Sequence, residues 1–414
     1  MSSQANHSQK VISAAGHWRA LGILCTALVL SMTSWFSATA ITPELRDTWK
    51  LSEPFLVWLT NGVQIGFVIG ALASSLVNLP DIIRLNRLMA ASAAMAAVAN
   101  ASLLFEPGQG GLLLARAATG IALAGVYPPA LKLVSTWFAN ERGLALGVVI
   151  GALTLGSASP HLVRALSGSL DWRVVVVTAT VSTLAGAVTF LLYAREGPIP
   201  FGKAIFDPRQ IGAVFCNKPL MYASAGYLGH MWELYAMWTW LLTFNRAALK
   251  AQGGVSESIP SLITFIAISM GMIGCVAGGL LSDRFGRTFT TAGMMIVSGT
   301  CAAFIGFTFD GPFWLFALVS LFWGISIVGD SAQFSAAATE LADPRYVGTA
   351  LSLQLGLGFA LTIGAIWLMP RVADELGSWQ WAFLVLAIAP FSGAAAMLAL
   401  RLLPDSLKMA GGKR

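Results

Sequence analysis

The sequence predicts an all-α polytopic membrane protein with twelve spanning helices in two six-helix bundles, and three observations lead to this fold class. Ten stretches of at least 18 residues contain no charged side chain, and each is long enough to cross a hydrocarbon core as a helix. Of the 414 residues, 56% are hydrophobic and only 11% are charged, whereas about a quarter are charged in soluble globular proteins. Two further apolar segments that do contain charges bring the number of spans to twelve.

The charge-free stretches predict ten helices directly. They are residues 20–43, 54–80, 88–105, 143–163, 174–194, 258–282, 288–309, 311–329, 346–370 and 376–400. The charged apolar segments, 109–138 and 218–246, supply the fourth and seventh helices. The first stretch ends at Ala40 in a way that imitates a signal peptide, but its apolar run exceeds the roughly 7–15 residues of such a signal. We therefore expect it to be retained as the first spanning helix.

The longest polar segment between helices, residues 195–217, divides the chain into two halves of six helices each. We expect bundles at 20–194 and 218–403, with short tails at 1–19 and 404–414. Within the polar segment, Phe201, Ile205 and Phe206 beside Lys203 and Arg209 suit a stretch that lies on the membrane surface, and a plain linker is the alternative.

The two halves resemble each other at an offset of about 203 residues. Trp35 in the first helix corresponds to Trp238 in the seventh, and Asp81 after the second helix corresponds to Asp283 after the eighth. Duplicated bundles of this kind are used by secondary transporters, which rock their two halves around a site near the membrane midplane. The repeat therefore favours transport by alternating access.

The basic residues predict the orientation of the chain. With both termini on one side, sixteen of the 25 Lys and Arg residues fall on that side and seven on the other, so the positive-inside rule places both termini in the cytoplasm. We expect a monomer in a bacterial inner membrane, and we attribute the pI of about 9.3 to inner-face anchoring instead of nucleic-acid binding. The four scattered cysteines have no metal, haem or disulfide spacing, so we expect no cofactor and no metal.

A nine-residue segment after the eighth helix carries a specific motif. Its sequence, Gly279-Leu280-Leu281-Ser282-Asp283-Arg284-Phe285-Gly286-Arg287, fits the pattern G-x-x-x-D-R-x-G-R. The pattern resembles the signature of the major facilitator superfamily, and the chain looks like a member along nearly its whole length. The resemblance implies that Gly279, Asp283, Arg284, Gly286 and Arg287 help to hold an outward-open state. Physically, the glycines permit a tight turn, and a carboxylate is favoured beside a helix amino terminus.

Two further segments resemble elements of the superfamily. The first-half copy of the motif keeps Asp81 and Arg87 but lacks both glycines. The segment from Arg116 to Gly120 is similar to the R-x-x-x-G element associated with proton coupling. The fifth helix lacks the Gly-Pro pair of many proton antiporters, and we interpret its dispersed glycines as positions of close helix packing.

Only four charges fall inside spanning helices: Arg116 and Lys132 in the fourth, Glu233 in the seventh and Asp330 in the tenth. Each costs about 2.5–3.5 kcal/mol on insertion scales and is a functional candidate by default. In the superfamily, helices 1, 4, 7 and 10 line the central cavity. At a rise of about 1.5 Å per residue, Arg116 and Glu233 fall at one depth and Lys132 and Asp330 at another. We therefore predict an outer and an inner ion pair, although a kink at Pro128-Pro129 would alter which faces meet.

A carboxylate in an intermittently dry cavity is driven towards its neutral form, and a nearby cation drives it back. Glu233 is the first candidate for loading a proton, His230 one turn away is a candidate relay, and Asp330 is the second carboxylate candidate. A permanent structural ion pair is the alternative. Further cavity candidates combine aromatic faces with a few hydrogen-bonding groups: Ser31, Ser34, Trp35, Tyr127, Tyr227, Trp238 and Gln333.

The sequence leaves three functional hypotheses. The first is proton-coupled uptake of a small organic solute, including an organic anion, and the second is proton-driven efflux of a drug or metabolite. The third is a membrane enzyme or sensor, for which no catalytic motif is present. An inorganic-anion carrier is disfavoured, because no arginine lies in the interior of the second or eighth helix. The expected partners are a small-molecule substrate, protons and the lipid bilayer.

Overall fold

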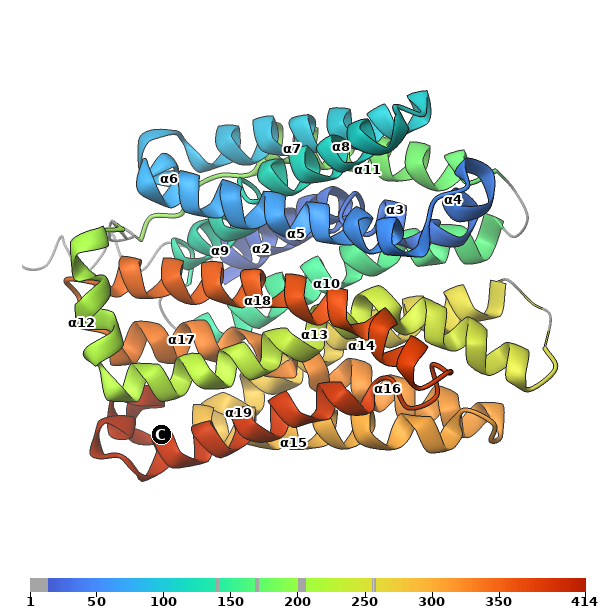
Figure 1. The fold of residues 1–414 in the computed structure, drawn as a ribbon. Coiled ribbons are helices and arrows are strands. Elements are labelled where there is room, and N and C mark those ends of the chain that lie inside the picture. Colours follow the sequence, from blue (N-terminus) through green and yellow to red (C-terminus); the bar gives the residue numbers. More distant parts are fainter. Residues whose placement is uncertain (1–13, 139–140, 168–170, 200–205, 255, 257) are drawn as a thin grey trace, which may run out of the picture.

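The computed structural model describes residues 14–138, 141–167, 171–199, 206–254, 256 and 258–414, and the regular elements of these segments are all helical. The amino-terminal half, blue to green, lies alongside the carboxy-terminal half, yellow to red (Figure 1). Ten of the described helices are long and apolar enough to cross a membrane. The other two predicted spans are also helical. The first is a shorter apolar helix, Gly16–Met32, and the seventh is the 34-residue helix α13. The predicted all-α polytopic fold is confirmed.

The described residues of the first half form ten α-helices of unequal length and one 3-10 helix. They are α2 (Ala14–Met32), α3 (Ser37–Ala40), α4 (Thr42–Trp49), α5 (Glu53–Leu76), α6 (Leu79–Ile82), α7 (Leu85–Ala101), η1 (Ser102–Phe105), α8 (Gly108–Leu123), α9 (Tyr127–Ser135), α10 (Arg142–Ser167) and α11 (Arg173–Tyr193).

The second half follows a connecting segment that contains η2 (Pro208–Gln210) and α12 (Ile211–Cys216). Its elements are α13 (Lys218–Ala251), α14 (Ser258–Phe285), α15 (Arg287–Phe304), η3 (Ile305–Thr308), α16 (Phe313–Gly329), α17 (Ser331–Leu341), α18 (Val347–Glu375), α19 (Leu384–Leu402) and η4 (Pro404–Gly412).

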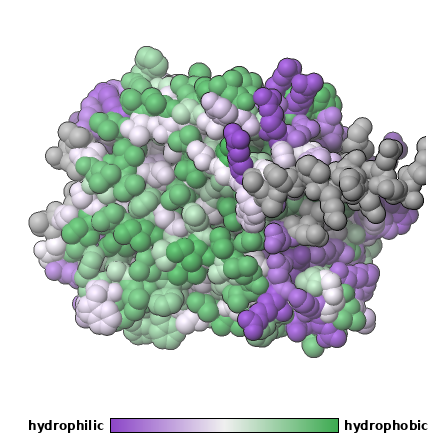
Figure 2. Space-filling view, turned by 180° about the vertical axis from the view of Figure 1, so that it is seen from behind, coloured by the Kyte–Doolittle hydropathy of each residue, from purple (hydrophilic) through white to green (hydrophobic). Residues whose placement is uncertain are grey.

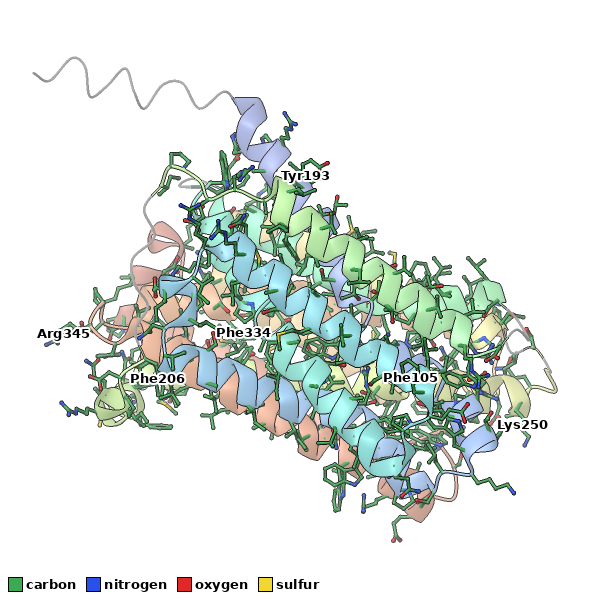
Figure 3. All side chains as sticks on the ribbon, turned by 90° about the horizontal axis from the view of Figure 1, so that it is seen from above. Phe105, Tyr193, Phe206, Lys250, Phe334 and Arg345 are labelled. Carbon is green, nitrogen blue, oxygen red and sulfur yellow. The ribbon has the colours of Figure 1, made fainter. Side chains whose placement is uncertain are left out.

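The helices run between two polar ends of the molecule. Phe206 and Arg345 lie at one end, and Phe105 and Lys250 lie at the other (Figure 3). The first end also carries α12 and the C-terminus (Figure 1) and is called the inner end below, because the basic residues predict that it is cytoplasmic. On the face seen in Figure 2, hydrophobic side chains cover most of the middle, and hydrophilic ones gather towards the inner end. Exposed apolar residues such as Val188 and Ile388 are consistent with a lipid-facing belt.

Three of the predicted spans are interrupted near the middle of the protein. The first span breaks between α2 and α3, the fourth between α8 and α9, and the tenth at Asp330 between α16 and α17. Pro128 and Pro129 lie in the first turn of α9, where proline fits because the amide hydrogens there have no intrahelical partner. The expected effect of this proline pair is therefore confirmed, with the break immediately before it.

The two halves meet where α10 packs on α14 and where α5 packs on α18. A Cβ atom added at Gly147 of α10 would lie 2.6 Å from the Cys275 carbonyl oxygen of α14, so the two backbones are nearly in contact. At the other interface, the Ser75 and Ser352 hydroxyls lie 3.2 Å apart, and the Asn61 amide donates to the Ile363 carbonyl at 3.2 Å. The packing interpretation of the glycines in the fifth span is consistent with these contacts.

Gly120 packs closely against α5, which gives a first testable prediction. A Cβ atom at Gly120 would lie 2.0 Å from the Val63 carbonyl oxygen, so Gly120→Ala forces α8 and α5 apart. We expect it to lower the free energy of unfolding by about 1–3 kcal/mol, the usual effect of overpacking. Thermal unfolding in detergent measures the loss. Gly22→Ala is the matched control, because no described atom beyond the chain neighbours and the backbone of its own helix lies within 4 Å of the added carbon; an equal effect of both changes would contradict the prediction.

The tails and the connecting segment are described only in part. Residues 1–13 and 200–205 lie outside the described residues, so the predicted surface stretch around Phe201, Lys203 and Ile205 stays a prediction, as do the bundle boundaries. The C-terminal tail packs against the second half: Met409 is buried, and the Ala410 amide donates to Glu340 at 3.2 Å.

Candidate functional site

A cavity of about 330 Å³ lies between the halves at the inner end. Its lining comes from both halves: Ser75, Pro80, Pro128, Leu131, Lys132, Ser135, Gly143, Leu146, Tyr227, Arg287, Ser335, Ala336, Thr339, Glu340, Gly348, Leu351, Ser352, Gln354 and Leu355. Two cations and several hydroxyl and amide groups stand among apolar walls, which is the usual composition of a small-molecule site. The cavity therefore suits a solute with an anionic or hydrogen-bonding group.

Lys132 lines this cavity and forms an ion pair with Asp81. The Nζ atom lies 2.5 Å from Asp81 Oδ1 and 3.3 Å from the Pro80 carbonyl oxygen. Asp81 follows α5 and belongs to the first-half copy of the motif, so the loop after the second span is tied to the fourth span. The predicted inner pair of Lys132 with Asp330 is wrong, because Lys132 turns towards this loop at the inner end.

Arg287 of the second-half motif also lines the cavity and is bound to α17. Its Nε and Nη2 atoms donate to the two carboxylate oxygens of Glu340 at 2.7 and 2.6 Å, and Nη1 donates to Gln333 Oε1 at 2.8 Å. The loop after the eighth span is therefore tied to the tenth span. This arrangement corresponds to the Asp81–Lys132 contact of the first half, with the positions of acid and base exchanged.

The rest of the motif follows its expected geometry in part. The Asp283 carboxylate lies over the first turn of α10, where a Cβ added at Gly143 would be 3.3 Å from Oδ1. Gly286 has φ of 92°, a conformation that favours glycine, and the C-terminal residues pack against its backbone. Arg284 is exposed, with its guanidinium 5.2 Å from the Phe285 ring centroid, and Arg87 is also exposed.

Asp330 lies beside His230 deep between α13 and the tenth span. The Nδ1 atom of His230 is 2.9 Å from Asp330 Oδ1, and Nε2 is 2.9 Å from the Ser331 hydroxyl. Both His230 and Asp330 are nearly inaccessible. The His230 ring stacks on Tyr227, at 6.2 Å between ring centroids, and Tyr227 lines the inner cavity. An imidazole between a carboxylate and a hydroxyl is a group that can take up a proton one helical turn from the cavity.

Glu233 lies elsewhere, inside the second half. Its Oε1 accepts a hydrogen bond from the Trp323 indole at 2.7 Å, and its Oε2 accepts one from the Ser298 hydroxyl at 2.8 Å. These partners lie on α16 and α15, so the carboxylate points away from the first half. The predicted outer pair of Arg116 with Glu233 is wrong, because depth along two helices does not fix the direction in which each side chain points.

Arg116 is completely buried and caps the broken first span. Its guanidinium donates to the Ser34 carbonyl at 3.1 Å, the Leu59 carbonyl at 3.3 Å and the Ser37 hydroxyl at 3.3 Å, and also to the Trp35 carbonyl. The break after α2 frees carbonyl groups that have no intrahelical partner, and a cation is favoured at a helix C-terminus. Arg116 thus holds the backbone of the first span in place.

Six aromatic residues close the path above the inner cavity and are called the aromatic plug. They are Trp35, Phe36 and Phe67 from the first half and Tyr235, Trp238 and Phe359 from the second. Ring centroids across the interface lie 4.3 Å apart for Phe67 and Phe359, 5.8 Å for Trp35 and Tyr235, and 5.9 Å for Phe36 and Trp238. The cavity between the halves therefore lies on the inner side of the closed plug.

Other predicted cavity residues have different positions. The Ser31 hydroxyl donates to the Ala27 carbonyl at 2.8 Å and packs on Gly186 of α11, and the Ser34 hydroxyl donates to the Ser31 carbonyl. Tyr127 begins α9 and is half-buried. Gln333 binds Arg287, as described above.

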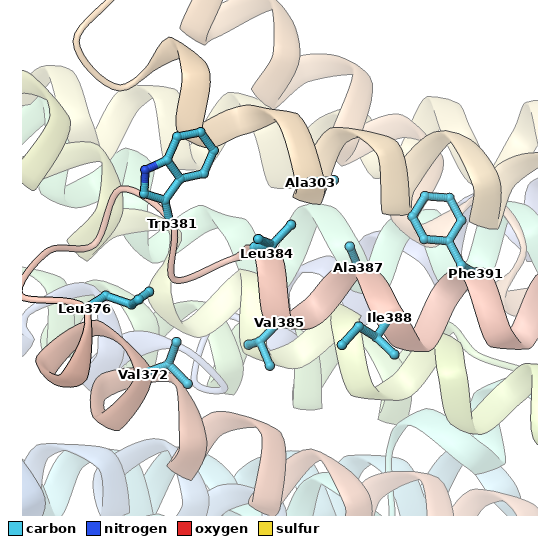
Figure 4. A pocket seen from close by; sticks show the side chains of 9 residues that line it. All are labelled: Ala303, Val372, Leu376, Trp381, Leu384, Val385, Ala387, Ile388 and Phe391. Carbon is cyan, nitrogen blue, oxygen red and sulfur yellow. The ribbon is translucent and has the colours of Figure 1, made fainter.

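A second hollow, of about 460 Å³, lies on the outside of the second half between α15, the end of α18 and α19 (Figure 4). Its lining is apolar, with Trp381, Leu384 and Phe391 around it, and Ile388 is largely exposed. It faces the surface that the hydrophobic belt assigns to lipid, so it does not belong to the path between the halves.

Several residues of the path were missed from the sequence. Gln64, Gln354 and Glu340 lie at the interface or in the cavity, and Ser331 completes the His230 cluster. For Gln64 a signal was present, because an amide inside the apolar run 54–80 is unusual. Glu340 carried no such signal, since it lies beyond the charge-free run of its helix.

Comparisons with known proteins agree with this architecture. Residues 23–362 match the family model described as Major Facilitator Superfamily. A hexuronate transporter of Bacillus subtilis is 26% identical over 298 residues, which cover 66% of this chain and 69% of that protein. A 3-(3-hydroxy-phenyl)propionate transporter of Escherichia coli is 30% identical over 180 residues, 41% of this chain and 42% of that one. A probable sulfoacetate transporter of Cupriavidus necator is 22% identical over 191 residues, 42% and 44% of the two chains.

A solved structure has the same fold. It is a bacterial homologue of the human lysosomal transporter Spinster, in an inward-facing and unoccupied conformation. The TM-score is 0.63 at 16% sequence identity, and the match covers 93% of this chain and 94% of the other. With the family match over most of the sequence, the two halves and the path between them, the chain belongs to the Major Facilitator Superfamily and is a multi-pass membrane transporter, not an enzyme.

Proposed function

We propose that the protein takes up a small organic anion together with protons by alternating access. The observation that carries this proposal is the His230–Asp330 pair, which lies directly behind the cavity residue Tyr227. With a proton on the imidazole the pair is neutral, and without it the pair has a charge of −1. An uncompensated charge inside a spanning segment costs about 2.5–3.5 kcal/mol on insertion scales, so proton uptake favours movement of the loaded carrier.

The cavity supports an anionic substrate. Lys132 and Arg287 face it from opposite halves, each beside a carboxylate of its own half. A substrate anion can share these cations when the halves approach, which links binding to closure of the inner end. The three bacterial relatives described above are named for organic anions: hexuronate, 3-(3-hydroxy-phenyl)propionate and sulfoacetate.

The experiment is transport by purified protein in liposomes with a pH-sensitive dye inside. Glucuronate, 3-phenylpropionate and sulfoacetate are added outside in turn, with an inward proton gradient. We expect one of these anions to accumulate and the lumen to acidify in proportion. Accumulation without proton movement would contradict the proposed proton coupling. Failure of all three anions to accumulate would contradict the proposed substrate class. Liposomes sorted by protein orientation separate uptake from efflux, the second hypothesis.

Glu233→Gln gives a second prediction in the same assay. Because Glu233 binds Trp323 and Ser298 within the second half, we expect substrate-driven proton movement to stay within about twofold of wild type. The replacement keeps the side-chain volume, and the Ser298 hydroxyl can turn to accept a hydrogen bond. If proton movement disappears while substrate exchange continues, Glu233 is the coupling carboxylate and the role given to Asp330 is wrong.

A further inference from the structure

A small vestibule of about 20 Å³ lies between the halves on the outer side of the aromatic plug. It is lined by Thr39, Thr42, Pro43, Leu56, Thr60, Thr239, Trp240, Leu242 and Thr243. Five of these residues are threonines, and they come from the first, second and seventh spans. Hydroxyl groups at this position mark the outer mouth of the path that the plug closes.

Three polar side chains lie four residues inward from residues that line this vestibule. Trp35 precedes Thr39 by four residues, Gln64 follows Thr60 by four, and Trp238 precedes Leu242 by four. All three side chains are at most 1% exposed. Within the described part of the chain, neither Trp35 Nε1, nor Trp238 Nε1, nor either amide atom of Gln64 has a hydrogen-bond partner.

These unpartnered groups lie on the surface where the halves separate. Trp35 and Trp238 both contact Tyr235, with centroid distances of 5.8 and 5.5 Å. Gln64 lies on α5 between Asn61 and Phe67, and each of these contacts α18 of the other half. Most buried polar atoms in folded proteins have partners, and an orphaned one costs about 1–3 kcal/mol. Opening of the outer side would give these groups water or a ligand.

The side chains of Trp35, Gln64 and Trp238, together with the plug residues around them, are called the layer below. The charge beside this layer is positive. Arg116 donates to the carbonyl of Trp35, and its other partners are two carbonyls and a hydroxyl. Among the residues that the structure describes, no carboxylate lies within 4 Å of its guanidinium. The arginine therefore contributes a positive potential that no neighbouring anion cancels.

The aromatic faces define the shape of the ligand. When the halves separate, the contacts of Trp35 with Tyr235 and Phe359, and of Phe36 with Trp238, are lost together. A planar aromatic ring can restore such contacts by inserting between the separated faces, which adds about 0.5–1.5 kcal/mol per pair beyond area burial.

We propose that this layer is the outward-facing binding site and that it accepts a planar aromatic carboxylate. The indole N–H groups of Trp35 and Trp238 and the amide of Gln64 donate to the carboxylate, and the plug residues hold the ring. The inference rests on the proposed function in taking the solute to be an organic anion, and it adds the chemical class and the groups that select it.

The test is binding of benzoate to the full-length protein in lipid nanodiscs at equal pH on both sides, observed by fluorine NMR after incorporation of 5-fluorotryptophan. Trp35→Phe and Trp238→Phe assign the two plug resonances, and the exposed Trp314 is the internal control. We expect benzoate to shift both plug resonances saturably and to leave Trp314 unmoved. Benzamide, which lacks the charge, and cyclohexanecarboxylate, which lacks the planar ring, should bind at least tenfold more weakly.

Gln64→Leu should weaken benzoate binding at least tenfold while the fluorine spectrum of the remaining tryptophans stays that of the folded protein. No saturable shift, equal binding of benzamide, or an unchanged affinity in folded Gln64→Leu would each overturn the proposal. No proton gradient is present, so benzoate binding can persist when proton coupling fails, and coupling to another anion can persist when benzoate binding fails.

Discussion

Asp330→Asn is expected to abolish proton-driven accumulation while leaving substrate exchange across the membrane intact. The asparagine keeps the size of the side chain but removes the charge that stabilises a protonated His230, whose Nδ1 lies 2.9 Å from Asp330 Oδ1. The free energy that links proton uptake to movement is thereby lost. We expect accumulation in liposomes to fall to background, a decrease of at least about 100-fold if the coupling exceeds 2.7 kcal/mol. Counterflow of labelled substrate at equal pH should stay within about threefold of wild type.

The pH dependence provides the control. In wild type, transport should accelerate as the pH falls on the side that supplies protons, whereas Asp330→Asn should give a flat profile. Ser331→Ala removes only the hydroxyl at 2.9 Å from Nε2 and should retain coupling with a shifted profile. A wild-type pH profile in Asp330→Asn would contradict the role of the pair, and loss of counterflow would mean that the variant is not folded or cannot bind substrate.

Arg116→Ala is expected to have the largest effect on stability. It removes a charged donor from three buried carbonyls, those of Ser34 and Trp35 at the break in the first span and that of Leu59 in α5. At about 1.5–3 kcal/mol for each hydrogen bond to a charged group, the free energy of unfolding should fall by about 3 kcal/mol or more. Equilibrium unfolding in mixed detergent micelles measures the change. Arg195→Ala, at an exposed arginine, should remain within about 0.5 kcal/mol of wild type.

A double-mutant cycle distinguishes this capping role from the ion pair predicted from the sequence. Since Arg116 and Glu233 have separate partners, the effects of Arg116→Lys and Glu233→Gln should add within about 0.5 kcal/mol. Arg116→Lys keeps the charge but not the planar fork that reaches several carbonyls at once, so it should still destabilise the protein. An interaction energy above 1 kcal/mol between the two sites would contradict the capping role and support the ion pair predicted from the sequence.

The fold was accessible from the sequence because lipid imposes a simple requirement on each span. A backbone in hydrocarbon must satisfy its own hydrogen bonds, so a long charge-free run is necessarily a helix, and counting runs was enough to find ten spans. The fourth and seventh spans, which carry interior charges, were also found, because Arg116, Lys132 and Glu233 stand out against an apolar background.

The interaction partners of those charges could not be predicted from the sequence. Depth along a helix follows from the residue number, but azimuth changes by about 100° per residue and is further altered at each break. The breaks at 33–36 and 124–126 lie beside Arg116 and between the two cations of the fourth span. Consequently Arg116 binds freed carbonyls, Lys132 pairs with Asp81, and Asp330 contacts His230. The sequence had nevertheless placed each of these charges on the correct span.

The aromatic plug illustrates the same limit for apolar residues. Trp35 and Trp238 were expected in the path, but nothing in the sequence distinguishes Phe36, Phe67 or Phe359 from other phenylalanines in apolar runs. Their importance arises from contacts between residues hundreds of positions apart, and periodicity within one helix contains no information about such contacts.

The position of Asp330 has a mechanical consequence. This residue lies at the break in the tenth span. The 17-residue helix α16 extends from it towards the outer face, and the 11-residue helix α17 extends towards the inner one. The shorter helix, α17, carries Gln333 and Glu340, which accept hydrogen bonds from Arg287 at the inner end. In the proposed mechanism, a proton gained or lost beside Asp330 would therefore act on the same short helix that binds Arg287 at the inner end.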